Sequence, residues 1–105
     1  MTPVEIAKRI IEEADKVGFK APHGHTQAMT GSCYVELAYR AGRFWGSVEV
    51  RISDHAPSES AFLAAAQRGC HFIDVKRDDL ASKMAAVMRD LGDTRAVVDA
   101  RAGAG

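Results

Sequence analysis

Four histidines are the first residues of this chain that could carry chemistry. His23 and His25 are separated by one residue, His55 directly follows Asp54, and His71 stands apart. Imidazole can serve as a general base or as a ligand of zinc, which prefers nitrogen and sulfur donors in a tetrahedron. The chain has no Cys-x-x-Cys or His-x-x-x-His pair that would complete such a tetrahedron. We therefore expect no metal and no cofactor, and interpret His23 and His25 as solvated loop residues.

Asp54 and His55 could also supply the orienting carboxylate and the base of a small hydrolase. Neighbouring residues at a strand end point in opposite directions, which makes a direct contact between the two side chains unfavourable. The sequence shows no Gly-x-Ser-x-Gly pattern, no Gly-rich phosphate loop and no dinucleotide motif. We expect that the protein is not an enzyme, and keep a hydrolase that uses His55 as a second alternative.

The element that must position these residues is a predicted β-hairpin, in which apolar and polar residues alternate over 32–39 and again from 44 onward. An even-numbered loop over residues 40–43 pairs Tyr39 with Phe44 and Tyr34 with Glu49, and it places all apolar side chains on one face. A three-residue loop would move a charged side chain onto that face. The other face then carries Ser32, Tyr34, Glu36, Ala38, Trp45, Ser47, Glu49, Arg51 and Ser53.

The remaining segments predict helices around this hairpin. A capping box between Thr2 and Glu5 begins a first helix, which ends at Gly18. Residues 20–30 have no sustained period and are interpreted as a loop. Ser58 is a suitable N-cap for a helix over residues 59–68.

The C-terminal part of the chain predicts one more strand and one more helix. Residues 71–75 read as a strand, which should run parallel to the second hairpin strand if the two are neighbours, because a helix connects them. The alternative is that this segment extends the preceding helix. Asp78 or Asp79 begins the last helix, and Gly92 ends it. The fold class is therefore α+β, with two layers in the order α-β-β-α-β-α and helices on one face of a small, mainly antiparallel sheet. Residues 1–92 form a single globular domain, and residues 93–105 form a partly flexible C-terminal tail.

Charge and composition exclude several classes of partner. Fourteen basic and fourteen acidic residues cancel in 105 residues, so the chain has no overall field for duplex nucleic acid or an anionic membrane. The longest apolar runs contain only a few residues, and no export signal is present. We expect a cytoplasmic protein in which Cys33 and Cys70 are reduced thiols.

The polar face of the hairpin and the histidine segment together predict a binding site. Aromatic rings stack on bases, and arginine binds phosphate through two parallel hydrogen bonds. We predict that a small anionic, nucleotide-like ligand binds with its phosphate on Arg51 and its ring on Tyr34 or Trp45. An outer face of this composition is also typical of cross-strand pairing or of a dimer interface, and we expect a homo-oligomer. The residues predicted to bind the ligand are His23, His25, Thr30, Ser32, Tyr34, Trp45, Arg51, Ser53, Asp54 and His55.

The hairpin resembles one found in small phage and prophage proteins of unassigned function. The likeness consists of a Ser-x-Tyr-Val strand, here residues 32–35, and an Arg-Ile-Ser-Asp-His strand end, here residues 51–55. This resemblance implies a bacterial or phage origin and an accessory role in countering host defence. Such a role could be the sequestration of a nucleotide immune signal, or alternatively the inhibition of a host defence protein through a protein–protein interface. The positions that the resemblance implicates are Ser32, Tyr34, Arg51, Ser53, Asp54 and His55.

Overall fold

One sheet of four strands organises the chain, and the strands lie in the order β1-β2-β3-β4. The computed structural model describes residues 1–29, 31–55 and 69–104. The helices are α1 (Pro3–Lys16) and α3 (Leu80–Ala104). The strands are β1 (His25–Met29), β2 (Ser32–Ala41), β3 (Phe44–Ser53) and β4 (His71–Asp74).

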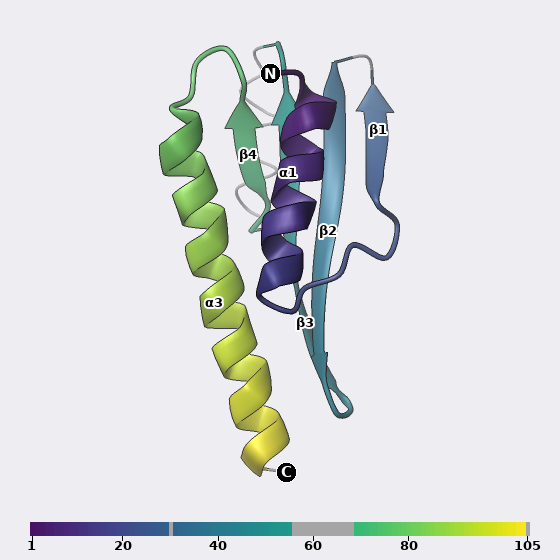
Figure 1. Cartoon of the computed structure of the whole chain (residues 1–105), viewed down its shortest axis with the longest axis vertical. Helices are drawn as coiled ribbons and strands as arrows, with labels where there is room; N and C mark the ends of the chain where they lie inside the picture. The colour runs from purple at the N-terminus through teal and green to yellow at the C-terminus, as the bar shows by residue number, and fades with distance from the viewer. Residues whose placement is uncertain (30, 56–68, 105) are drawn as a thin grey trace.

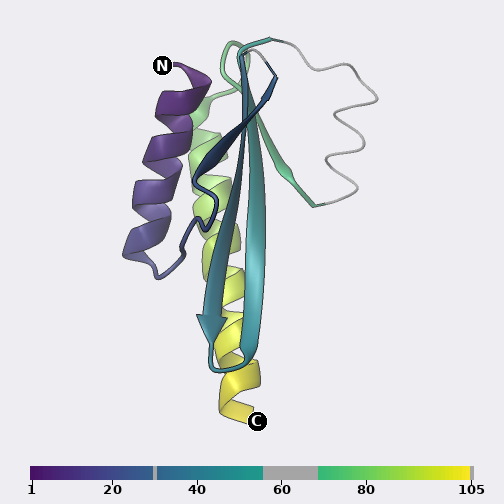
Figure 2. The ribbon, with the colours of Figure 1, turned by 90° about the vertical axis from the view of Figure 1, so that its right-hand side faces the viewer.

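Both helices lie on the same face of this sheet (Figures 1 and 2). β2 pairs antiparallel with β1 and with β3, whereas β4 runs parallel to β3. The predicted α+β class, with two layers and a mainly antiparallel sheet, is confirmed, as is the parallel orientation of the last strand. The described elements follow the order α-β-β-β-β-α. Ser58 and the helix predicted over residues 59–68 lie outside the described residues.

α1 begins and ends as its sequence predicts. The Thr2 hydroxyl accepts a hydrogen bond from the Glu5 backbone N–H at 3.2 Å, and the Glu5 carboxylate reaches back to Thr2. Beyond the helix, Gly18 has a φ of 92°, a conformation that glycine adopts without steric cost. Phe19 then folds back under the helix and is buried, with its N–H donating to the Ala14 carbonyl at 3.0 Å.

The hairpin has the predicted faces but a different register. Its loop contains only Gly42 and Arg43, so Ala41 pairs with Phe44 and Val35 pairs with Val50. The predicted four-residue loop is therefore wrong. Gly42 occupies the first central position with a φ of 62°, which favours the two-residue loop that is commonest in hairpins. Because the shift is two residues, every side chain keeps its face.

The sequence analysis predicted a loop over residues 20–30, and for part of this segment the prediction is wrong. Residues 25–29 form β1, in which His25 pairs with Val35 and Thr26 pairs with Tyr34. This strand carries little apolar periodicity, because its first three residues are polar and two of them, Thr26 and Gln27, are exposed. The pattern that reveals a half-buried strand is therefore weak in this segment.

The last helix does not end at Gly92, so this prediction is also wrong. α3 continues as one helix of 25 residues to Ala104, and residues 93–104, which were assigned to the tail, are helical. Glycine inside a helix costs about 1 kcal/mol relative to alanine, which contacts beyond it can offset. Val98 is buried, and Arg95 donates to the Val17 carbonyl at 2.7 Å. The second half of α3 thus covers the part of the hairpin that α1 does not reach (Figure 1).

The core lies between the helices and one face of the sheet. Cys33 and Val35 on β2, and Val50 and Ile52 on β3, are almost completely buried there. Phe72 and Ile73 on β4 point to opposite faces and are both buried, as their adjacent positions predicted. The remaining fully buried core side chains include Ile6, Ile10, Phe19, Leu37, Val87 and Leu91.

Candidate functional site

The strand register aligns one row of side chains across the face of the sheet opposite α1 and α3. Thr26 pairs with Tyr34, Tyr34 pairs with Arg51, and Arg51 pairs with Phe72. Directly paired residues share a face, so all four side chains lie on what we call the Tyr34 face. The sequence analysis placed Tyr34 and Arg51 on this face correctly, but opposite Glu49 and Ser32 respectively.

Arg51 is the cation at the centre of this row. Its Nε donates to the Ser32 hydroxyl at 3.3 Å, and within the described residues it forms no ion pair. Ser32 pairs with Ser53 at the end of the hairpin, and both serines are only 2% exposed. The Ser32 hydroxyl accepts from Arg51 across the two strands, and the Ser53 hydroxyl bonds with His55, so both hydroxyls are engaged within the protein rather than presented to solvent.

The Ser-Asp-His end of β3 has the composition of a catalytic triad but not its geometry. The His55 Nδ1 lies 3.2 Å from the Ser53 hydroxyl and 3.3 Å from the Asp54 carboxylate. The expectation that Asp54 and His55 would not touch is therefore wrong. In a triad the serine and the carboxylate bind different ring nitrogens, whereas here both lie at the same nitrogen. Because Ser53 is also buried, this arrangement cannot present a serine nucleophile.

Tyr34 lies beside two carboxylates. Glu36 and Glu49 pair directly across β2 and β3, where like charges repel. Burial raises the pKa of Tyr34 to about 12, and its hydrogen bond to Glu49 together with the charges of Glu49 and Glu36 adds to the increase. Tyr34 therefore stays a neutral hydrogen-bonding phenol at any physiological pH.

Titration of tyrosine absorbance in Tyr39→Phe, which leaves Tyr34 as the only tyrosine, is expected to show ionisation near pH 12. Because the pKa is higher in the folded state than in the unfolded chain, the contribution of Tyr34 to stability is fully present below about pH 10 and is lost as the pH rises toward 12. Adding Glu49→Gln should lower the pKa of Tyr34. Ionisation at the ordinary value of about 10 would contradict the arrangement of Tyr34 and Glu49.

The predicted ligand-binding residues do not converge on one place. Trp45 lies six residues from Arg51 along β3, which corresponds to about 20 Å at roughly 3.3 Å per residue. His25 pairs with Val35 and so belongs to the helix-facing side of the sheet, while His23 is exposed in the segment before β1. Thr30 lies outside the described residues. The residues that the structure does bring together are Ser32, Tyr34, Arg51, Ser53, Asp54 and His55.

A cavity of about 350 Å³ lies at the other end of the hairpin, along the outer edge of β2. β1 begins at His25, opposite Val35, and therefore does not pair with the part of β2 that follows Val35 toward the hairpin loop. There the backbone of Lys20 pairs with Ala38 through two hydrogen bonds of 2.8 and 2.7 Å. The side chains that surround this space define what we call the Trp45 cavity. Its lining consists of Gly18, Lys20, Pro22, Ala38, Tyr39, Arg40 and Trp45.

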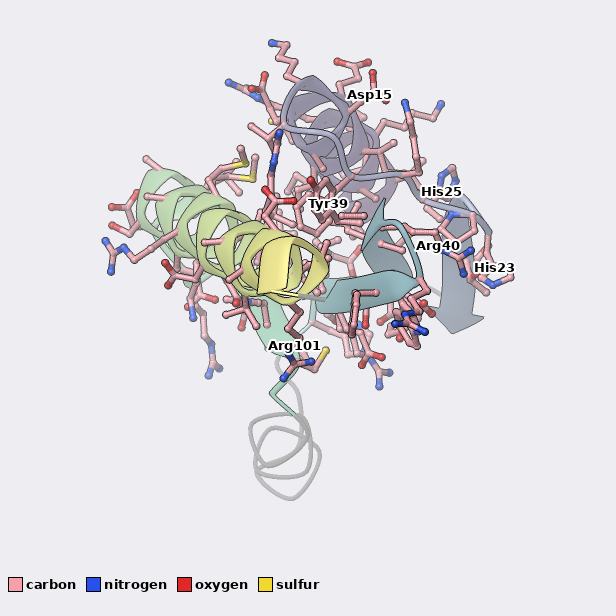
Figure 3. All side chains as sticks on the ribbon, turned by 90° about the horizontal axis from the view of Figure 1, so that it is seen from below. Asp15, His23, His25, Tyr39, Arg40 and Arg101 are labelled. Carbon is pink, nitrogen blue, oxygen red and sulfur yellow. The ribbon has the colours of Figure 1, made fainter. Side chains whose placement is uncertain are left out.

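Aromatic and cationic groups meet in the Trp45 cavity. Trp45 is 59% exposed and pairs directly with Arg40 on the neighbouring strand. The Lys20 ammonium forms an ion pair with Asp15 at the end of α1, whereas Arg40 has no ion pair with any described residue. Figure 3 shows Arg40, His23 and His25 toward the β1 edge of the sheet, with Tyr39 closer to the two helices.

Tyr39 is held firmly in the wall of the cavity. Its ring lies 5.4 Å from that of Phe19, and the Arg95 guanidinium lies 5.1 Å from its centre. The hydroxyl donates to the Asp99 carboxylate at 2.5 Å. This hydrogen bond, together with desolvation, raises the pKa of Tyr39. The side chain is therefore a rigid neutral surface, positioned by the second half of α3.

The sequence analysis included Trp45 in the site but missed Lys20, Tyr39 and Arg40. The available signal was Gly42, which favours a two-residue loop and thereby places Arg40 opposite Trp45. Nothing in the sequence indicates that Lys20 would pair with Ala38, because this contact joins residues far apart in the chain.

Several further observations limit what the site can be. Within the described residues, no three His, Cys, Asp or Glu side chains gather in a way that could hold a metal ion. Cys33 and Cys70 do not form a disulfide with each other, and burial raises the pKa of the Cys33 thiol. Neither α1 nor α3, the two helices among the described residues, is long and apolar enough to cross a membrane.

No protein-family model, curated protein sequence or solved structure matches this chain.

Proposed function

We propose that the protein binds a small anionic ligand of nucleotide type in the Trp45 cavity. The observation that supports this proposal most directly is the pairing of Arg40 with Trp45 on the wall of that cavity. In this arrangement the guanidinium binds the phosphate through two hydrogen bonds, and the indole stacks on the base. Arg40 thus takes the phosphate-binding role that the sequence analysis assigned to Arg51.

The size and surroundings of the cavity favour a mononucleotide over a longer chain. A volume of about 350 Å³ is at the small end of ligand-binding pockets. Glu36 and Glu49 lie between Trp45 and Arg51 on the Tyr34 face, and two adjacent carboxylates repel a phosphate backbone laid along the strands. The ligand therefore occupies one end of the hairpin, not its whole length.

The biological role that we propose follows from the resemblance to phage and prophage proteins. In that role the protein sequesters a nucleotide signal of the host immune response. The alternative role is inhibition of a host defence protein by direct contact. The exposure of Trp45 favours this alternative specifically, since tryptophan is enriched at the centres of protein interfaces.

Fluorescence of Trp45 tests the binding proposal, because this is the only tryptophan in the chain. Titration with nucleotides at up to millimolar concentration is expected to quench its emission, since a stacked base covers an indole that is exposed in the free protein. Arg40→Ala should weaken binding by about tenfold or more, the loss expected for a charge-assisted hydrogen bond.

Arg43→Ala is the matched control for this experiment. Arg43 lies in the hairpin loop over the Phe44 ring, 5.7 Å from its centre, and does not line the cavity, so its loss should leave the affinity unchanged. Quenching that disappears in Arg51→Ala but persists in Arg40→Ala would move the site to the Tyr34 face. No change in fluorescence or thermal stability with any nucleotide, combined with capture of a host protein that Trp45→Asp abolishes, would favour the interface role.

A further inference from the structure

We infer that the Trp45 cavity selects singly charged phosphodiesters over doubly charged phosphate monoesters, and that Asp15 sets this preference. The inference rests on the proposed function, because it concerns the ligand of the same cavity. It identifies Asp15, which lies outside the cavity lining, as a residue that determines specificity.

The charges around the cavity are unequally compensated. Lys20 and Arg40 are the two cations among the lining residues, and the other lining side chains carry no charge. The Lys20 ammonium is already paired with the Asp15 carboxylate, whereas Arg40 has no ion pair with any residue that the structure describes. The charge that the cavity can offer to a ligand without breaking an existing contact is therefore that of Arg40.

The charged residues behind Tyr39 do not alter this balance. Arg95 and Asp99 are paired with each other at 3.6 Å, and the Tyr39 hydroxyl donates to the same Asp99 carboxylate. As a pair, Arg95 and Asp99 therefore add no net charge beside the cavity. Glu36 lies four residues from Arg40 along β2, which places it about 13 Å away at roughly 3.3 Å per residue.

The charge of the ligand then decides its affinity. A phosphodiester carries one negative charge and is matched by Arg40 alone, whereas a phosphate monoester carries about −1.5 to −2 at pH 7. The second charge of a monoester can reach Lys20 only if the ammonium leaves Asp15, and the carboxylate that remains repels the ligand. An exposed ion pair is worth up to about 1 kcal/mol, which corresponds to a preference of about three- to fivefold.

Two nucleotides with the same base and sugar measure this preference. Cyclic AMP carries a phosphodiester and AMP a phosphate monoester, and both are titrated against Trp45 fluorescence in the 105-residue chain. The unmodified protein should bind cyclic AMP about three- to fivefold more tightly. Asp15→Asn should strengthen AMP binding by about the same factor and cyclic AMP binding by a smaller factor, because the repulsion from a nearby carboxylate grows with the charge of the ligand. Asp15 is 59% exposed at the end of α1, so this variant is expected to fold normally.

Glu13→Gln is the matched control, since Glu13 lies on the same helix but pairs with Lys16 at 3.0 Å instead of with Lys20. It should leave both affinities unchanged. AMP binding as tightly as cyclic AMP, or an unchanged preference in Asp15→Asn, would overturn the inference and leave the proposed function standing. Failure of both nucleotides and of the wider nucleotide panel to bind would remove the proposed function and the inference together.

Discussion

A chain that ends at Gly92 is expected to lose about 4 kcal/mol or more of its free energy of unfolding, which is a large part of the roughly 5–15 kcal/mol that stabilises a typical domain. The truncation removes the buried Val98 side chain, the hydrogen bond from Tyr39 to Asp99, and the contact of Arg95 with the Val17 carbonyl. It also exposes the part of the hairpin that, among the described helices, the second half of α3 covers. Urea denaturation followed by circular dichroism measures the loss.

A chain that ends at Ala102 is the control for this truncation. Residues near the end of a helix fray and contribute little, so its denaturation midpoint should match that of the full chain. If the chain that ends at Gly92 were as stable as the full chain, residues 93–105 would be the partly flexible tail that their composition predicts. That outcome would contradict the packing of α3 on the hairpin.

Gly46→Val is expected to destabilise the protein by about 3 kcal/mol, the upper part of the range for overpacked cores. A Cβ at Gly46 would lie 2.8 Å from the Thr94 Cγ2 and 3.0 Å from the Val98 Cγ2. Both neighbours are β-branched side chains of α3, which have little rotational freedom to move away. The larger side chain therefore forces α3 away from the hairpin. Thermal and urea denaturation measure the effect.

Ser47→Val provides the matched control, since it adds a valine one position further along β3, where the side chain is exposed. Valine suits an exposed strand position, so the stability should change by less than about 0.5 kcal/mol. Val98→Ala combined with Gly46→Val should recover part of the loss, because it makes room at the contact itself. Equal effects of the two valine substitutions would show that α3 does not pack against Gly46.

Tyr39 connects the stability of α3 to the binding site, because residues of α3 hold its side chain in the wall of the Trp45 cavity. Asp99 and Arg95, which hold the Tyr39 ring, belong to the half of α3 that the truncation removes. The same helix therefore covers the hairpin and supports one wall of the Trp45 cavity. A variant with a displaced α3 should lose nucleotide-dependent quenching even where the rest of the sheet stays folded.

The local patterns that were predicted correctly all depend on residues close together in the chain. The capping box at Thr2 and Glu5 requires only one helical turn, and the alternation along β2 and β3 assigns every side chain to a face. The predicted hairpin loop was two residues too long. The alternation of apolar and polar residues shows that the loop has an even number of residues, but it does not distinguish a loop of two from a loop of four. Gly42 carried the missing information, since its positive φ suits a two-residue loop.

By itself, the sequence determined the fold class, the two faces of the hairpin and the residue types that could bind a nucleotide. Only the tertiary structure decided that Arg51 and Trp45 lie near opposite ends of β3, that β1 begins at His25, and that α3 continues past Gly92. The physical reason is that each of these features depends on contacts between residues distant in the chain. The pairing of Lys20 with Ala38 and the hydrogen bond between Tyr39 and Asp99 leave no periodic signal in the sequence. These two contacts position Lys20, Ala38 and Tyr39, which line the Trp45 cavity.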